Sequence, residues 1–227
     1  MTDPVIDIVI PVRQADCCDA GNAPLFTLQG RTLWDITLDQ ALEAECPRRV
    51  VIAHDDDRFA DHVAARGDAV TLTKRPPELS GAGKTTLDVL AHIAETAPDG
   101  ADYLMLLEMT HPLRPKGIID ELMRVVAADR PDSLITCHRA DYNYWRGSAD
   151  GAMERVIGGG ETGGTALYQE LTGIGSIFRA DLLGGPNPFG EKVDMAPIDR
   201  FWATVDIRDE DGLWLAERYL ERIGATL

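Results

Sequence analysis

The stretch VIDIVIPVR, Val5 to Arg13, decides the fold class of this chain. Its residues are nearly all apolar or β-branched, and Asp7 is the one acidic residue inside the run. A continuous apolar run of this kind predicts the first, central strand of a parallel sheet that is covered on both faces. Because open α/β sheets bind ligands beyond the carboxyl ends of their strands, the segment from Gln14 onward is the first place to look for a site.

Strand and helix patterns alternate along the rest of the chain. Helical spacing of apolar residues predicts helices at 33–45, 59–64, 85–96, 118–127 and 211–223. Short apolar or β-branched runs predict strands at 50–53, 69–73, 103–107, 133–137, 174–178 and 203–207, and the continuously apolar 103–107 is predicted to be central as well. Strand-helix units in series require right-handed crossovers, so we expect an α/β protein with a mostly parallel sheet and helices on both faces.

Two segments interrupt this alternation. A loop of about twenty residues rich in Asp, Gly, Ala and Pro follows the first strand, and loops of that length in a compact domain are usually functional or disordered. The segment 139–172 is polar and glycine-rich with clustered aromatic residues, a composition that suits a lid, a β-arm or a dimer contact. No repeat or linker divides the chain, so residues 1–227 are expected to form one domain with this segment as an inserted arm.

Charge, cysteine spacing and hydropathy limit the partners and the location of the protein. The formal net charge of -16 and the sequence pI of about 4.6 argue against binding to nucleic acid, whose phosphates would be repelled. The four cysteines show no Cys-x-x-Cys pair, and reduced thiols in a cytoplasmic protein are the simpler interpretation. The first residues lack the features of a signal peptide, and no apolar run reaches the length of a membrane span, so a cytoplasmic location is expected.

Five motifs in this order resemble the acylneuraminate cytidylyltransferase (CMP-sialic acid synthetase) family, of which the chain looks like a divergent member. They are Ile10-Pro11-Val12-Arg13, His54-Asp55-Asp56, Arg75-Pro76, the run LLEMTHPLR from Leu106 to Arg114, and Val205-Asp206-Ile207. The resemblance implies a Rossmann-like nucleotidyltransferase domain that joins CMP from CTP to a hydroxyl of a sugar or sugar-like acid and releases pyrophosphate. It also implies Mg²⁺ as a cofactor and a homodimeric assembly.

The resemblance assigns roles to particular residues. It places Arg13 and Asp206 in catalysis, with Asp206 also as the metal ligand. It places Arg13, Asn22, Arg75 and Thr86 at the nucleotide, and the sequence adds Lys84, which stands at a helix start where an anion binds favourably. The substrate-binding residues would be Glu108, His111, Arg114 and Tyr168. Four of these residues have a plainer interpretation: Arg13 as a solvated residue at a strand end, Arg75 as a surface cation, Thr86 as a hydroxyl in a first helical turn, and His111 as a turn residue beside proline.

The sequence also departs from the family at three places. The loop after Arg13 contains no Lys or Arg before Arg31. The family's Asp-x-Asp becomes Asp206-Ile207-Arg208. Asp206 could hold Mg²⁺ alone, with phosphate oxygens and water as the other ligands. Alternatively, Arg208 either replaces the second charge by meeting phosphate directly or pairs with Asp206 and abolishes the metal site. Glu108 replaces a glutamine, and basic residues are missing before Tyr168, so we expect an acceptor other than ordinary N-acetylneuraminate.

The sequence allows two further interpretations. The run from Gly81 to Thr86 is similar to the end of a phosphate-binding P-loop, but Glu78 stands where that motif needs its first glycine, so a kinase or ATPase is not favoured. The alternative to an enzyme is a non-catalytic homologue that binds a nucleotide or sugar nucleotide, or serves as a structural subunit, after losing the phosphate-loop lysines and one metal carboxylate. Fold similarity alone does not choose between them.

Overall fold

The computed structural model describes residues 2–13, 26–45, 47–57, 63, 69–81, 83–97, 99–140, 143–156 and 166–225. Within these residues the main sheet has the strand order β10-β7-β11-β6-β1-β4-β5, and β12 pairs with β7. Its strands are β1 (Ile6–Val12), β4 (Arg49–His54), β5 (Val70–Lys74), β6 (Tyr103–Leu106), β7 (Ser133–Ala140), β10 (Leu167–Glu170), β11 (Ile177–Arg179) and β12 (Val193–Pro197).

The central strands are parallel, as the sequence predicts. β1 pairs in parallel with both β4 and β6, and β4 pairs in parallel with β5. β11 is antiparallel to β6 and β7, and β10 is antiparallel to β7. The chain is therefore an α/β protein with a mostly parallel, Rossmann-like sheet, and both predicted central strands lie inside the sheet.

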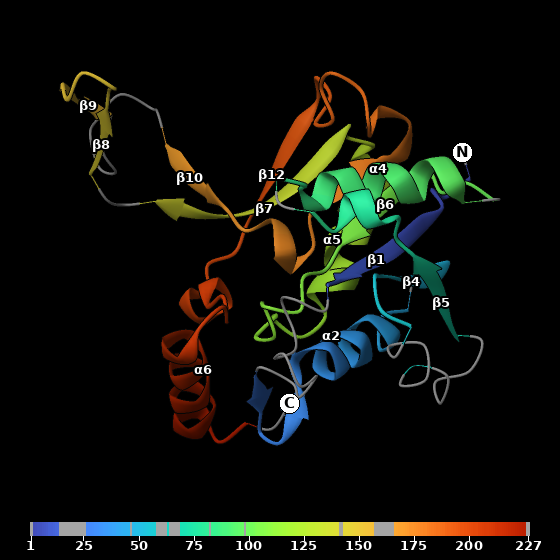
Figure 1. The fold of residues 1–227 in the computed structure, drawn as a ribbon, viewed down its shortest axis with the longest axis horizontal. Coiled ribbons are helices and arrows are strands. Elements are labelled where there is room, and N and C mark those ends of the chain that lie inside the picture. Colours follow the sequence, from blue (N-terminus) through green and yellow to red (C-terminus); the bar gives the residue numbers. More distant parts are fainter. Residues whose placement is uncertain are drawn as a thin grey trace.

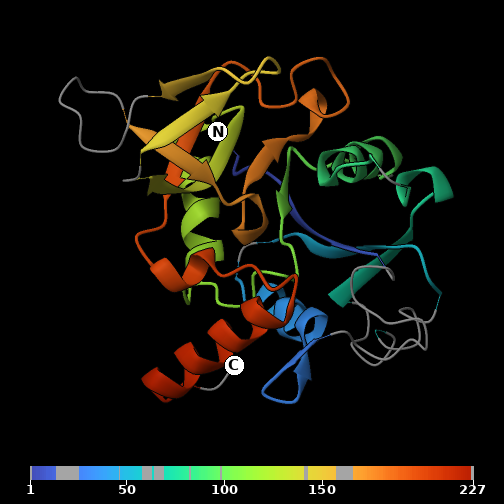
Figure 2. The same ribbon diagram turned by 60° about the vertical axis from the view of Figure 1, so that its left-hand side comes forward.

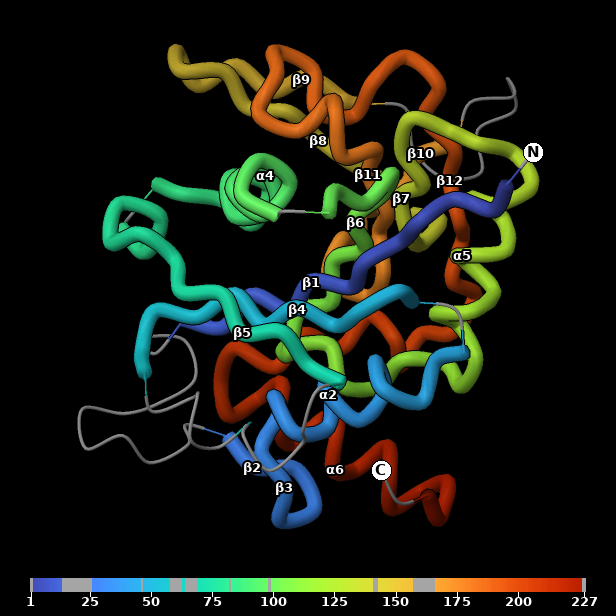
Figure 3. Tube along the Cα trace, turned by 90° about the vertical axis from the view of Figure 1, so that its right-hand side faces the viewer, coloured from blue at the N-terminus to red at the C-terminus, as the bar shows by residue number. Residues whose placement is uncertain are grey.

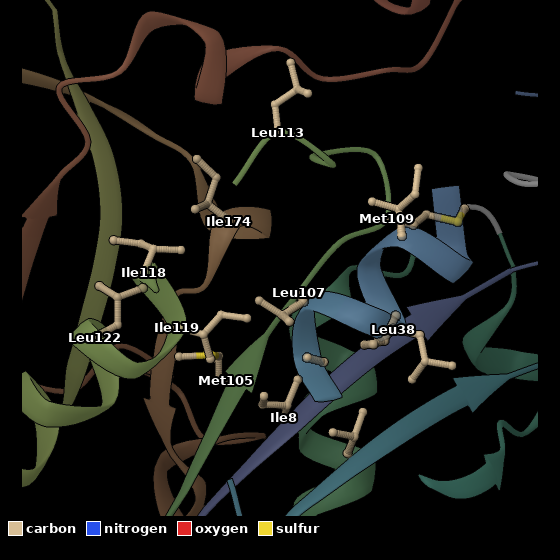
Figure 4. Packing of buried hydrophobic residues seen from close by; sticks show 14 of the residues in the cluster. Ile8, Leu38, Met105, Leu107, Met109, Leu113, Ile118, Ile119, Leu122 and Ile174 are labelled. Atoms are coloured by element: carbon tan, nitrogen blue, oxygen red, sulfur yellow. The ribbon is translucent and has the colours of Figure 1, made fainter. Parts of the chain in front are cut away.

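Helices cover both faces of the sheet. The long helices are α2 (Leu33–Leu42), α4 (Thr86–Thr96), α5 (Ile118–Asp129) and α6 (Glu210–Ile223). α4 lies on one face, and α2 lies on the other (Figure 3). Side chains of β1 alternate between the two: Val9 packs in the cluster that α4 covers, whereas Ile8 packs with α2 and α5 (Figure 4). This double coverage explains why the strand has no polar face.

Asp7 is buried inside β1 with its charge neutralised. Its carboxylate is fully buried and accepts hydrogen bonds from Arg48 at 2.8 and 3.0 Å and from Arg49 at 2.7 Å. A buried carboxylate is tolerated when it is paired and hydrogen-bonded in this way. Asp7 therefore has a structural role, because it fixes Arg48 and Arg49 at the start of β4.

One predicted strand begins too early and another is wrong. The strand predicted at 174–178 is found as β11 (Ile177–Arg179), but its first predicted residue belongs to a 3₁₀ helix, η3 (Thr172–Ile174). The range 203–207 forms no strand, because η5 (Phe201–Thr204) occupies its beginning and the Ile207 amide then donates to the Thr110 carbonyl at 2.8 Å. The segment packs against the loop after β6, which buries Ala203 and Ile207. Its residues are apolar for this reason and not because they pair in a strand.

β12 was not predicted because its alternation is weak. Its sequence, VDMAP, ends in proline, and Val193 and Met195 are each 41% exposed. Such a strand lies at an edge and carries no continuous apolar signal. The predicted helix at 59–64 lies outside the described residues except for Val63, which is buried.

A separate hairpin stands away from the main sheet. β8 (Tyr144–Gly147) and β9 (Met153–Val156) form a two-stranded antiparallel sheet within the predicted arm, and Figure 1 shows it projecting from the body of the molecule next to β10. In Figure 2 this side of the molecule comes forward, so the hairpin overlaps the main sheet in that view. Tyr144, Trp145 and Met153 on this hairpin are exposed. No described helix is long and apolar enough to cross a membrane.

Candidate functional site

A cavity of about 510 Å³ opens where the parallel strands end. Its walls come from the end of β1, the loops after β5 and β6, the start of α4 and the segment before α6, which are the parts of the chain the topology brings to one edge of the sheet. The described residues that line it are Pro11, Arg13, Phe26, Arg75, Leu79, Lys84, Thr85, Thr86, Val89, Glu108, Met109, Thr110, Ile207 and Arg208.

The charge of this cavity is opposite to that of the chain. Of the ionisable residues among the described lining, Arg13, Arg75, Lys84 and Arg208 are basic and only Glu108 is acidic. The whole chain has 22 basic and 38 acidic residues, so this gathering of cations is local. Cations in a concave site raise the local concentration of anionic ligands. The cavity is therefore suited to a ligand with several negative charges, such as a polyphosphate.

Arg13 and Arg75 lie next to each other in the wall at the ends of β1 and β5. Arg13 donates to the Ser80 carbonyl at 3.4 Å, and Arg75 donates to the Val12 carbonyl at 3.0 Å. Arg75 is only 6% exposed, and Asp55 lies 3.7 Å from its guanidinium. Arg75 is thus held rigidly beneath the cavity, whereas Arg13 is only half-buried at its edge.

The start of α4 supplies Lys84, Thr85 and Thr86. Thr85 is the N-cap, and it forms a capping box with Asp88, whose carboxylate accepts from the Thr85 amide at 2.7 Å. This carboxylate takes part of the anion-binding capacity of the helix start. Lys84 lies 3.7 Å from Asp88 and is 43% exposed, so its ammonium can still turn toward a ligand in the cavity.

Glu108, Asp206 and Arg208 form an ionic cluster at the opposite wall. Arg208 donates from Nε to Asp206 at 2.6 Å, and its Nη2 lies 3.5 Å from the Glu108 carboxylate. Arg208 and Glu108 line the cavity, while Asp206 lies behind them with its Oδ1 buried and without a hydrogen-bond partner. Of the two alternatives that the sequence left open for Arg208, the structure has the pairing with Asp206.

His111 is buried behind Glu108 and does not line the cavity. It is 6% exposed, and its Nδ1 lies 4.0 Å from the Glu108 carboxylate and 3.3 Å from the Thr110 hydroxyl. The pKa of His111 is lowered to about 4, chiefly because burial penalises the charged ring; the Asp206 carboxylate opposes this shift and Arg114 and Arg208 add to it. The imidazole is therefore neutral at pH 7.

We expect a His111→Gln variant to lose less stability than the wild type as the pH falls from about 7 to about 4.5. The unfolded wild type takes up a proton on His111 near pH 6.5, whereas the folded protein does so only near pH 4. Stability from the neutral ring is therefore present above pH 6.5 and is lost as the pH falls, by up to about 3 kcal/mol. Urea denaturation across this pH range measures the free energy of unfolding of both proteins. The contribution of the acidic residues is the same in both, so it cancels in the difference between them. Parallel pH profiles would contradict this assignment.

Arg114 and Tyr168 are not among the described residues that line the cavity. Arg114 is 8% exposed and its guanidinium is used inside the fold, so the structure assigns it to the scaffold and not to substrate binding. Tyr168 is 43% exposed on β10 opposite Arg139 of β7, and its contact with a substrate stays a prediction. Asn22 lies outside the described residues.

Sequence reasoning missed several lining residues. Phe26, Leu79, Met109 and Ile207 give the cavity its apolar portions. Met109 and Ile207 stand inside the motifs quoted from the sequence, which was the available signal for these two. Gly173 was also missed. Its backbone lies against the side chains of Glu108 and His111, because a Cβ there would be 2.7 Å from Glu108 and 2.8 Å from His111 Nδ1. This position therefore accepts only glycine without displacing Glu108.

The described residues do not fit a Mg²⁺ ion held by Asp206. One oxygen of Asp206 is bound by Arg208, and the other is buried away from the solvent that a hydrated cation would come from. No group of three or more His, Cys, Asp or Glu side chains suited to a metal occurs in the described part of the chain. The Arg208 guanidinium contacts both the Asp206 and the Glu108 carboxylates, and its positive charge would repel a divalent cation there.

Comparison with known proteins places the chain near cytidylyltransferases. It is 30% identical over 124 residues to the 3-deoxy-manno-octulosonate cytidylyltransferase of Geotalea daltonii, covering 55% of this chain and 46% of that protein. It is 32% identical over 137 residues to the enzyme of that name from Chromohalobacter salexigens, covering 60% and 49%. The chain thus spans about half the length of the curated relatives it matches. No protein-family model matches it.

Solved structures extend the similarity of fold over the whole chain. The 4-diphosphocytidyl-2C-methyl-D-erythritol synthase from Anaerococcus prevotii superposes with a TM-score of 0.70 and 14% identity, covering 96% of this chain and 97% of that one. A CMP:2-keto-3-deoxy-manno-octonic acid synthetase complexed with CTP superposes with a TM-score of 0.67 and 14% identity, covering 96% and 99%. At this identity the superpositions establish the fold.

Proposed function

We propose that this chain is a nucleotidyltransferase that transfers CMP from CTP to a hydroxyl of a sugar or sugar-like acid and releases pyrophosphate. The observation that carries the proposal is the gathering of Arg13, Arg75, Lys84 and Arg208 around one cavity in a strongly acidic chain. The similarity to cytidylyltransferases in sequence and in fold supports CTP as the donor.

The chemistry needs little from the protein beyond charge and position. An oxygen of the acceptor hydroxyl forms a bond to the α-phosphorus of CTP while the bond to the pyrophosphate oxygen breaks, and the hydroxyl proton leaves to solvent or a nearby carboxylate. Negative charge spreads over the phosphate oxygens in this step. Arg13 and Lys84 on one wall and Arg208 on the other are cations placed to stabilise that charge.

Glu108 bears on the choice of acceptor. Its carboxylate is the acidic side chain among the described lining, so it is suited to accept hydrogen bonds from sugar hydroxyls and to disfavour a second carboxylate beside it. We therefore propose that the acceptor is not ordinary N-acetylneuraminate. Pyrophosphate release with CTP and a panel of neutral and acidic sugars tests this, and efficient use of N-acetylneuraminate would refute it.

The donor site is tested by thermal unfolding with CTP, UTP, ATP, GTP, CMP and CDP, each with and without Mg²⁺. A ligand that binds only the folded protein at about 100 times its Kd stabilises it by roughly 2.7 kcal/mol. We expect the largest increase in Tm with CTP. If no nucleotide changes the Tm of folded protein, the transferase proposal fails. Binding of CTP without turnover of any acceptor would instead favour the non-catalytic homologue, which the Asp206–Arg208 pairing also favours.

We further propose that the chain forms a homodimer through the β8–β9 hairpin. The exposed Tyr144, Trp145 and Met153 on this projecting hairpin support it, because exposed aromatic residues that cluster on one element are typical of protein contacts. Light scattering on the intact chain should give the mass of two copies, and a Trp145→Ser, Met153→Ser variant should shift it toward one. A monomeric mass for the intact chain would exclude this arrangement.

A further inference from the structure

Arg208 occupies an unusual position among the cations of the cavity. Arg13, Arg75 and Lys84 lie on the side of β1, β5 and α4, whereas Arg208 lies across from them, after η5 and before α6. It contacts two carboxylates at once, Asp206 at 2.6 Å and Glu108 at 3.5 Å. Its side chain is 65% exposed even so, so part of the guanidinium faces the cavity.

The carboxylates that Arg208 joins are otherwise poorly matched to an anionic ligand. Glu108 is 19% exposed and lines the cavity, and the Asp206 side chain is 32% exposed directly behind. Two carboxylates at the wall of a polyphosphate site would repel the ligand unless a cation lay between them and it. Arg208 is the side chain that meets this requirement, because its planar group can bind a carboxylate on one edge and present N–H donors on another.

We propose that Arg208 is a built-in counter-ion that replaces a protein-bound divalent metal at the Asp206 and Glu108 carboxylates, so that the site binds its polyphosphate ligand without a metal ion held by the protein. This inference rests on the proposed nucleotide site and defines how that site is neutralised. It agrees with the state of both Asp206 oxygens, because Arg208 binds one and the other is buried, so neither is open to a hydrated ion while Arg208 is in place.

The first test uses a metal ion alone, with no nucleotide. Mn²⁺ binding is measured by electron paramagnetic resonance on wild type, Arg208→Asp and Arg208→Ala. The aspartate removes the counter-ion and adds a third carboxylate, so we expect it to bind Mn²⁺ at least about tenfold more tightly than the wild type. Arg208→Ala is expected to fall between them. Wild type that binds Mn²⁺ as tightly as Arg208→Asp would overturn the proposal.

The second test measures CTP affinity by calorimetry in EDTA and in excess Mg²⁺. The wild type should bind CTP in EDTA, and Arg208→Ala should bind it about tenfold more weakly there, with part of the loss restored by Mg²⁺. Arg218→Ala, on the exposed part of α6 and paired with Glu221, is the matched control and should match the wild type. Equal affinity of Arg208→Ala and wild type in EDTA would overturn the proposal.

The two tests separate this inference from the function on which it rests. If wild type binds no CTP under either condition, the proposed function fails. Tighter Mn²⁺ binding by Arg208→Asp would still support Arg208 as the counter-ion of the two carboxylates, and unchanged Mn²⁺ binding would refute that role as well.

Discussion

Replacing Arg114 with Met is expected to destabilise the folded chain by about 3 to 5 kcal/mol. Its guanidinium donates to the carbonyls of Ile174 at 2.9 Å and Gly173 at 2.7 Å, and to the side chain of Gln40 at 3.0 Å. It also donates to the carbonyl of Glu108 and the hydroxyl of Thr37. Met fills the space but leaves these buried acceptors without donors, and an unsatisfied buried acceptor is costly.

Charge alone does not explain this role. Burial lowers the pKa of Arg114 to about 9, which Glu108 opposes, so the group remains charged at pH 7. Arg114→Lys keeps the charge but lacks the planar fork, and it should be intermediate. Arg124→Met, on the exposed side of α5, should change stability by no more than about 0.5 kcal/mol. Urea denaturation measures all three, and an Arg114→Met variant as stable as Arg124→Met would contradict the scaffold role.

Arg13→Ala is expected to weaken CTP binding by roughly 10- to 100-fold with little change in folding stability. A hydrogen bond to a charged group contributes about 1.5 to 3 kcal/mol, and each 1.4 kcal/mol is a tenfold change in affinity. Arg13 lines the cavity at the end of β1 and is only half-buried, so its loss leaves the core intact. Calorimetric titration with CTP measures the affinity, and thermal unfolding without ligand checks the fold.

Arg218→Ala again serves as the control, because it removes an arginine far from the described lining of the cavity. If Arg13→Ala binds CTP as well as this control does, Arg13 does not contact the phosphates, and the donor would have to lie elsewhere in the cavity. A large loss of stability without ligand would instead place Arg13 in the scaffold.

Much of the site could be predicted because it follows from local sequence and from topology. The apolar run of β1 required a central parallel strand, and parallel strands bring their carboxyl ends to one edge of the sheet. Arg13, Arg75 and Glu108 follow strand ends, and Lys84 and Thr86 stand at a helix start. Their positions along the chain were therefore enough to bring them to the same cavity.

Other features were decided only by contacts between segments far apart in sequence. The sequence around Arg114 does not show that Gln40 and Gly173 will accept hydrogen bonds from its guanidinium. Arg114 was therefore predicted to bind substrate, whereas in the structure it stabilises the fold. The same limit applies to 203–207, where apolar residues were buried by the loop after β6 instead of by strand pairing.

The sequence by itself determined the sheet, its two covered faces and the edge at which the cations gather, because periodicity and apolar runs act over neighbouring residues. Only the tertiary structure decided which charges neutralise one another. The sequence already offers Asp206, two residues away, as a partner of Arg208, but no local pattern shows that the Glu108 carboxylate also lies 3.5 Å from the same guanidinium. Ion pairs depend on separation in space, and folding sets that separation across the whole chain.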